Sequence, residues 1–61
     1  MIKHGINKHG VNYYVISDHE FYCTYYDSTN VIEITITGVT LDYIQKLTII
    51  ELIEYKNKSN I

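Results

Sequence analysis

The sequence has no proline, tryptophan, arginine or alanine, and it has a single cysteine, Cys23. One cysteine cannot form a disulfide within the chain, so a small disulfide-stapled fold is excluded. A lone unpaired cysteine is also typical of a reducing compartment. We therefore expect a cytoplasmic protein, placed in the cytoplasm of the host cell if its gene is viral.

Long apolar runs and strong charge are missing as well. No run approaches the ~20 apolar residues that a membrane-spanning helix needs, and the first residues do not resemble a secretory signal. The formal net charge of -2 gives no long-range attraction toward phosphate backbones. We therefore expect no membrane contact, and nucleic acid stays a possible partner.

The chain of 61 residues is long enough for one small domain. A domain of this size buries only about 60% of the surface that its unfolded chain exposes, so its stability margin is thin. Such domains commonly gain stability from disulfides, a metal or a partner subunit. Since a disulfide is excluded and a metal is disfavoured below, we expect a homo-oligomer, most simply a dimer.

The clearest element is a strand over residues 31–37, in which apolar and polar side chains alternate. One face carries Ile32, Ile34 and Ile36, and the other carries Glu33, Thr35 and Thr37. Because successive side chains of a strand point to opposite sides, this pattern gives one buried face and one solvated face. Most of these residues are β-branched, which favours the strand further.

Two more strands precede it, and short polar turns connect the three. The first strand covers residues 11–17 and the second covers 20–26, with turns at 17–20 and 27–30. Strands joined in this way form an antiparallel meander. A further short strand near residues 2–6 would give the sheet a fourth member.

Counting across the second turn predicts which side chains share the core. A four-residue loop at 27–30 places Cys23 opposite Ile34. The same register puts Phe21 and Tyr25 on the isoleucine face.

The first hairpin leaves two registers open. An even loop adds Tyr14 and Ile16 to the core. An odd loop adds Val11, Tyr13 and Val15 instead. The aliphatic content favours the odd loop, although no glycine marks its turn.

The C-terminal part of the chain reads as a helical segment over residues 40–56, packed on one face of the sheet. Thr40 is a good N-cap after Gly38. The apolar stripe changes phase after Leu47, and Thr48-Ile49-Ile50-Glu51 matches a capping box. We therefore expect the segment to be kinked or split near 47–48.

Two alternatives for this segment remain open. A single straight helix would carry a second apolar stripe, suited to an oligomer contact and made of Ile49, Ile50, Leu52 and Ile53. Alternatively, residues 49–55 form a fourth strand, because isoleucine favours strands. In either case residues 57–61 read as a frayed polar tail.

Residues 1–10 contain most of a tandem repeat, in which Lys-His-Gly-Ile-Asn is followed by Lys-His-Gly-Val-Asn. This segment reads as an arm or an edge strand, where the glycines permit unusual backbone angles. Its basic side chains could instead contact nucleic acid or another anion. These candidate contacts are Lys3, His4, Lys8 and His9.

No constellation of catalytic or metal-binding residues stands out. His19 and Cys23 are side chains that zinc prefers, but four residues along a strand separate them by about 13 Å. Ser17, Asp18 and His19 are neighbours in a turn, whereas a catalytic triad is made by residues that converge in space. We therefore expect no enzyme activity, no metal and no cofactor.

The tyrosines carry the functional prediction. At least Tyr22 and Tyr26 should lie on the sheet face away from the helix, because they alternate with Phe21, Cys23 and Tyr25. Tyrosine is enriched at protein interfaces, so the sequence predicts a partner-binding face. Its residues are Tyr22, Tyr26, Glu33 and Thr35.

Two other interpretations of the tyrosines stay open. Tyrosine is common on half-exposed sheets that have no partner. The same rings could stack the bases of single-stranded nucleic acid. The negative net charge and the lack of arginine stand against nucleic acid.

The composition also indicates an origin. Isoleucine, asparagine, tyrosine, lysine and threonine, whose codons are largely AT-rich, are frequent. Such a composition is typical of a phage or mobile element with an AT-rich genome. Small non-catalytic proteins of that kind often bind and inhibit a host protein, so we expect a host partner such as a defence nuclease or a DNA-repair or transcription enzyme.

Overall fold

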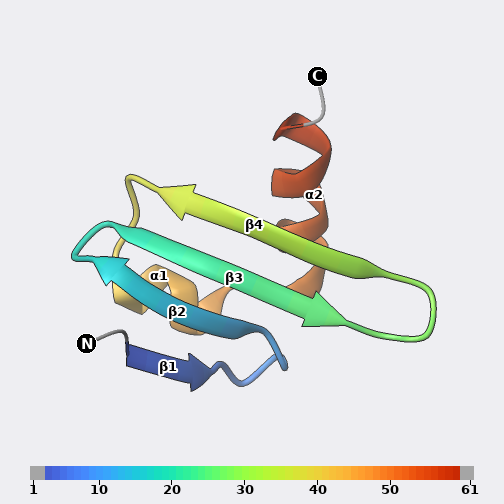
Figure 1. Cartoon of the computed structure of the whole chain (residues 1–61), viewed down its shortest axis with the longest axis horizontal. Helices are drawn as coiled ribbons and strands as arrows, with labels where there is room; N and C mark the ends of the chain where they lie inside the picture. Colours follow the sequence, from blue (N-terminus) through green and yellow to red (C-terminus); the bar gives the residue numbers. More distant parts are fainter. Residues whose placement is uncertain (1–2, 60–61) are drawn as a thin grey trace.

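The computed structural model of the protein describes residues 3–59, and residues 1, 2, 60 and 61 lie outside the described range. Within it, four strands are followed by two helices: β1 (Lys3–Ile6), β2 (Asn12–Ser17), β3 (Glu20–Tyr26), β4 (Val31–Thr37), α1 (Leu41–Lys46) and α2 (Ile49–Ser59). The strands form one antiparallel sheet in the order β1-β2-β3-β4 (Figure 1). The α+β prediction is confirmed, and the short N-terminal strand does join the sheet.

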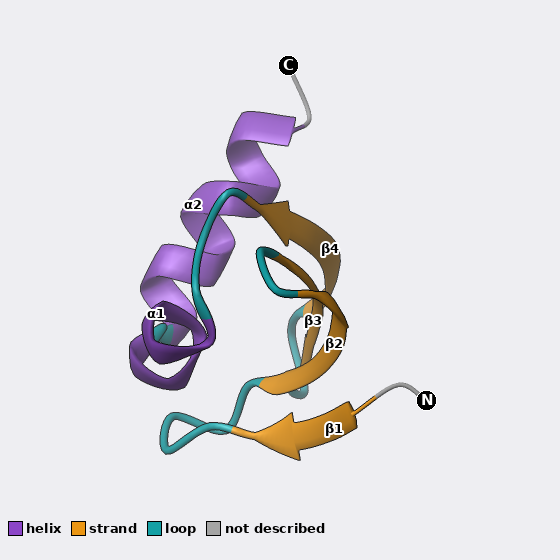
Figure 2. Cartoon of the chain, turned by 90° about the vertical axis from the view of Figure 1, so that its left-hand side faces the viewer, coloured by secondary structure: helices purple, strands orange, loops and turns teal. Residues whose placement is uncertain are grey.

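Both helices lie against the same face of the sheet (Figure 2). We call this side the inner face and the opposite side the outer face; none of the described elements covers the outer face. The core lies between the inner face and the helices, and its buried residues are Val11, Phe21, Cys23, Ile32, Ile36, Ile44, Leu47 and Leu52. The predicted alternation of β4 is therefore correct, with Ile32 and Ile36 buried and Ile34 half-buried at the edge of the sheet.

The hairpin between β3 and β4 has the register that the sequence predicts. Cys23 pairs with Ile34. The loop is closed by Asp27, whose backbone N–H donates to the carbonyl of Asn30 at 2.9 Å. The Asp27 carboxylate accepts backbone N–H groups of Thr29 at 2.8 Å and Asn30 at 2.6 Å. An aspartate that bonds the following backbone in this way fixes the loop length and, with it, the register.

The hairpin between β2 and β3 places Val15 opposite Phe21, so Tyr13 and Val15 face the core, as the odd loop predicts. The turn itself is tight, because Ser17 pairs with Glu20 across Asp18 and His19. This turn has an even number of residues. A β-bulge between Val15 and Ser17 adds one residue to β2, so the number of residues between Val15 and Phe21 is odd, as favoured. The aliphatic content predicted which face of β2 points to the core, whereas nothing in the sequence predicted the bulge.

The C-terminal segment is split where the sequence predicts. Thr40 caps α1 by accepting the backbone N–H of Tyr43 at 3.3 Å. The capping box of α2 is present, because the Thr48 hydroxyl accepts the N–H of Glu51 at 3.2 Å and the Glu51 carboxylate accepts the N–H of Thr48 at 3.1 Å. The break lets Leu47 and Leu52 both face the sheet although the apolar stripe changes phase.

The structure decides between the alternatives for this segment. Residues 49–55 are helical, as the predicted helix requires, and not a fourth strand. The prediction of a frayed tail is wrong for residues 57–59, because the helix runs to Ser59, while residues 60–61 lie outside the described range. No proline or glycine interrupts α2, and Lys56 and Lys58 in its last turn favour the negative end of the helix dipole.

The split also changes the expected oligomer contact. Leu52 is fully buried, and Ile49 and Ile53 pack partly buried against the core of the same chain. Ile50 is the member of that stripe that is left exposed, at 73%. The argument that a straight helix needs burial on two sides therefore does not apply.

Asn7 connects the loop between β1 and β2 to the break between the helices. Its side-chain amide donates to the carbonyls of Ile44 and Leu47, both at 2.9 Å. Its side-chain carbonyl accepts the backbone N–H groups of His9 at 2.9 Å and Val11 at 3.0 Å. This buried side chain thus satisfies backbone groups from both segments, which otherwise would lose hydrogen bonds on burial.

The Cys23 thiol predicts a dependence of stability on pH. Burial raises the pKa of Cys23 from 9.0 to about 11. Ionisation is then easier in the unfolded chain, so the stability that the neutral thiol contributes is fully present below about pH 9 and is lost as pH rises toward 11. We expect the wild-type protein to lose about 1 kcal/mol more than Cys23→Ala between pH 8 and pH 10 in urea unfolding. Both proteins share the same tyrosines, so parallel pH curves would contradict the burial of the thiol.

Candidate functional site

The outer face carries the side chains that alternate with the core. They include His4 and Ile6 on β1, Asn12, Tyr14 and Ile16 on β2, Glu20, Tyr22, Thr24 and Tyr26 on β3, and Val31, Glu33, Thr35 and Thr37 on β4. Several large apolar members of this set are at least half exposed: Ile6, Ile16, Tyr26 and Val31. Apolar side chains gathered on one uncovered surface are typical of an interaction site.

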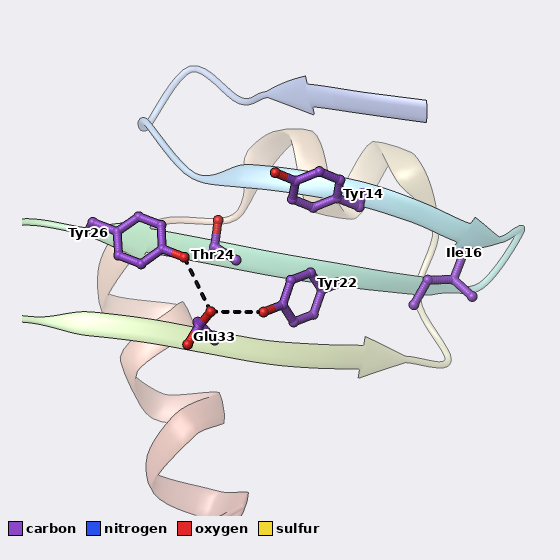
Figure 3. Close-up of a pocket in the computed structure, with 6 residues that line it drawn as sticks. All are labelled: Tyr14, Ile16, Tyr22, Thr24, Tyr26 and Glu33. Atoms are coloured by element: carbon purple, nitrogen blue, oxygen red, sulfur yellow. Dashed lines mark hydrogen bonds between the residues drawn. The ribbon is translucent and has the colours of Figure 1, made fainter. Parts of the chain in front are cut away.

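A cluster of two tyrosines and one glutamate lies near the middle of this face (Figure 3). Glu33 on β4 pairs with Thr24 on β3, and Tyr22 and Tyr26 lie two residues to either side of Thr24. Both phenols therefore flank the Glu33 carboxylate diagonally. The hydroxyl of Tyr22 donates to Oε2 of Glu33 at 3.1 Å, and that of Tyr26 donates to the same oxygen at 3.3 Å.

The cluster makes both phenols weaker acids. Desolvation, followed by the hydrogen bond to Glu33 and its negative charge, raises the pKa of Tyr22. Desolvation and the charge of Glu33 likewise raise the pKa of Tyr26. Both hydroxyls therefore stay protonated at neutral pH and remain donors to the carboxylate.

A row of aromatic rings continues from this cluster toward β1. Tyr14 lies opposite Tyr22 in the ladder, and their ring centroids are 5.8 Å apart at an angle of 41°. His4 lies opposite Tyr14 and stacks on it, with centroids 4.5 Å apart and an angle of 18°. The row thus crosses three strands of the outer face.

Side chains of the outer face border an open hollow of about 420 Å³. It is lined by Tyr14, Ile16, Tyr22, Thr24, Tyr26 and Glu33 (Figure 3). Thr24 lies among these larger side chains and is only 4% exposed. The lining combines apolar surface with one carboxylate, the combination by which binding sites give both affinity and orientation.

The structure brings Tyr22, Tyr26 and Glu33 into contact, and Thr35 lies on the same face opposite Tyr22. Tyr14 and Ile16 belong to the hollow but were not among the predicted site residues. The signal that could have found them is the odd register of the first hairpin, which turns both away from the core.

The four basic residues of the N-terminal repeat do not gather beside the tyrosines. All four are exposed, but only His4 lies on the outer face. Lys3 pairs with Val15 and so belongs to the opposite side of β1. Lys8 and His9 lie in the turn between β1 and β2.

Among residues 3–59, no group of three or more histidine, cysteine, aspartate or glutamate side chains could hold a metal ion. No helix in the same range has the length and apolar character needed to cross a membrane.

Comparison with protein-family models, with curated proteins and with solved structures finds no match to this chain.

Proposed function

We propose that the protein is a non-enzymatic, cytoplasmic binding protein whose outer face contacts another protein. The observation that carries this proposal is the uncovered aromatic surface of the sheet, in which Tyr14, Tyr22 and Tyr26 surround the hollow. Tyrosine gives large contact area with few rotatable bonds and a polar tip, which makes it effective at protein interfaces. The hydrogen bonds to Glu33 hold two of the rings in place before any partner arrives.

Single-stranded nucleic acid is the second candidate ligand, favoured by the row of His4, Tyr14 and Tyr22. Base stacking on such rings contributes about 1–3 kcal/mol per base. Binders of this kind place their rings in a positively charged groove. Here the hollow contains the carboxylate of Glu33 instead, which repels phosphate. Protein is therefore the better supported partner.

The kind of partner is proposed from composition and size and not from geometry. We propose a host protein that the binding inhibits, such as a defence nuclease or a DNA-repair or transcription enzyme, if the gene belongs to a phage or mobile element. A homo-oligomer stays a prediction from the small size of the chain. Of the expected contact residues on α2, Ile50 alone is strongly exposed.

Affinity capture from the native host cytoplasm tests the proposal with three proteins: the wild type, a Tyr22→Ser/Tyr26→Ser variant and a Leu41→Ser control. Leu41 is exposed on α1, so its variant removes apolar surface outside the outer face. We expect one protein to be retained by the wild type and the control and at least about tenfold less by the tyrosine variant. Circular dichroism checks that all three are folded.

Two results would contradict this function. If the tyrosine variant retained as much of the captured protein as the wild type, the outer face would not be the contact surface. Loss of the captured material after nuclease treatment of the lysate, with a salt-sensitive gel shift of single-stranded DNA, would favour nucleic acid instead.

A further inference from the structure

The Glu33 carboxylate can accept more hydrogen bonds than the tyrosines provide. A carboxylate offers about four acceptor sites on two oxygens. The hydroxyls of Tyr22 and Tyr26 both donate to Oε2. In Figure 3 the other oxygen points away from both phenols. The two hydrogen bonds therefore position the carboxylate and leave it acceptor capacity for a further donor.

The surroundings of Glu33 favour a cation. The residues that line the hollow include one acid and no base. The faces of tyrosine rings attract cations through their quadrupole, by about 0.5–2 kcal/mol according to exposure. A positive group that enters the hollow is therefore attracted by the carboxylate and by the rings of Tyr14, Tyr22 and Tyr26, while an anion is repelled.

From this charge complementarity we propose that the hollow binds the guanidinium group of an arginine side chain from a basic segment of the partner protein. The inference deepens the proposed function and rests on it. A guanidinium is planar and weakly hydrated, so it can stack on a tyrosine ring while its N–H groups donate to a carboxylate. A hollow of about 420 Å³ has room for such a side chain.

A second copy of the chain does not fit this role. The sequence contains no arginine, so another copy cannot supply the guanidinium. A symmetric contact through the outer face would also bring the same surface, with its Glu33 carboxylate, against itself. The occupant is therefore a different protein that presents an arginine.

Nuclear magnetic resonance titration of the full chain tests the inference. The probe is the peptide acetyl-Gly-Arg-Gly-amide at pH 7.5 and low salt, and the matched control is the same peptide with neutral citrulline in place of arginine. We expect saturable shifts of the ring signals of Tyr14, Tyr22 and Tyr26. The affinity for the arginine peptide should be at least about fivefold higher than for the citrulline peptide.

Two variants distinguish binding in the hollow from nonspecific attraction to negative charge on the protein. Glu33→Gln should abolish the preference for arginine over citrulline. Glu54→Gln, which removes an exposed negative charge on α2, should keep it. Equal affinity for the two peptides, or an unchanged preference in Glu33→Gln, would overturn the inference. If neither peptide binds while capture of the partner still depends on Tyr22 and Tyr26, this inference fails and the protein-binding function stands.

Discussion

Replacing Asn7 by alanine should lower the free energy of unfolding by about 2–4 kcal/mol. The change removes a buried side chain that donates to two carbonyls at the helix break and accepts two N–H groups of the preceding loop. Alanine leaves those backbone groups without these partners, in a region where water is excluded. Urea unfolding followed by circular dichroism measures the loss.

Asn12 is the matched control, because it occupies the same place in the second copy of the repeat. It lies on the outer face, where its carbonyl oxygen is 3.4 Å from the His4 ring. Asn12→Ala should lower stability by less than about 1 kcal/mol. Asn7→Asp should be at least as harmful as Asn7→Ala, since a carboxylate cannot donate to the two carbonyls. Similar losses for the two alanine variants would show that Asn7 does not join the loop to the helices.

Phe21→Ala should lower the free energy of unfolding by about 3–5 kcal/mol, while Tyr22→Ala should change it by about 1 kcal/mol or less. The two aromatic residues are neighbours on β3 and point to opposite faces. Phe21 is 1% exposed in the core, whereas the Tyr22 hydroxyl reaches Glu33 on the outer face. The first change opens a cavity in the core, and the second removes a half-exposed contact.

Equilibrium unfolding of the two variants measures their losses of stability. A second measurement compares their affinities for the partner. Phe21→Ala should bind normally wherever it remains folded, and Tyr22→Ala should bind weakly although it is stable. If Tyr22→Ala lost stability and Phe21→Ala lost only partner binding, then Tyr22 would face the core and Phe21 the outer face, which would contradict the account.

Much of the fold could be predicted because the signals are local. The strand alternation has a period of two, so a loop of known length fixes which side chains of β3 and β4 share a face. The pairing of Cys23 with Ile34 follows from that count. The helix break was equally visible, because a capping box is a chemical pattern of four consecutive residues, here from Thr48 to Glu51.

Other features depend on the tertiary structure and left no local signal. Asn7 and Asn12 are equivalent in the repeat, yet only Asn7 meets the carbonyls of Ile44 and Leu47, far away in the sequence. No glycine in the sequence indicates the β-bulge near Ile16. The sheet buries most of the apolar stripe on α2, and this burial depends on the angle at the helix break. Because no local pattern gives that angle, the sequence left the stripe as a candidate oligomer contact.

The candidate site was partly predictable for the same reasons. Parity places Tyr22, Tyr26 and Glu33 on one face, as predicted. The hydrogen bonds of both phenols to one oxygen, and the stacking of His4 on Tyr14, require the observed register of the strands.

The most direct test of the outer face as the binding surface is a footprint of tyrosine reactivity, measured by hydroxyl-radical oxidation and mass spectrometry with and without the captured partner. Our account predicts that Tyr22 and Tyr26 lose most of their reactivity in the complex. Tyr43 and Tyr55, whose hydroxyls lie 3.1 Å apart on the two helices, should keep theirs. Protection of Tyr43 and Tyr55, with Tyr22 and Tyr26 unchanged, would contradict it.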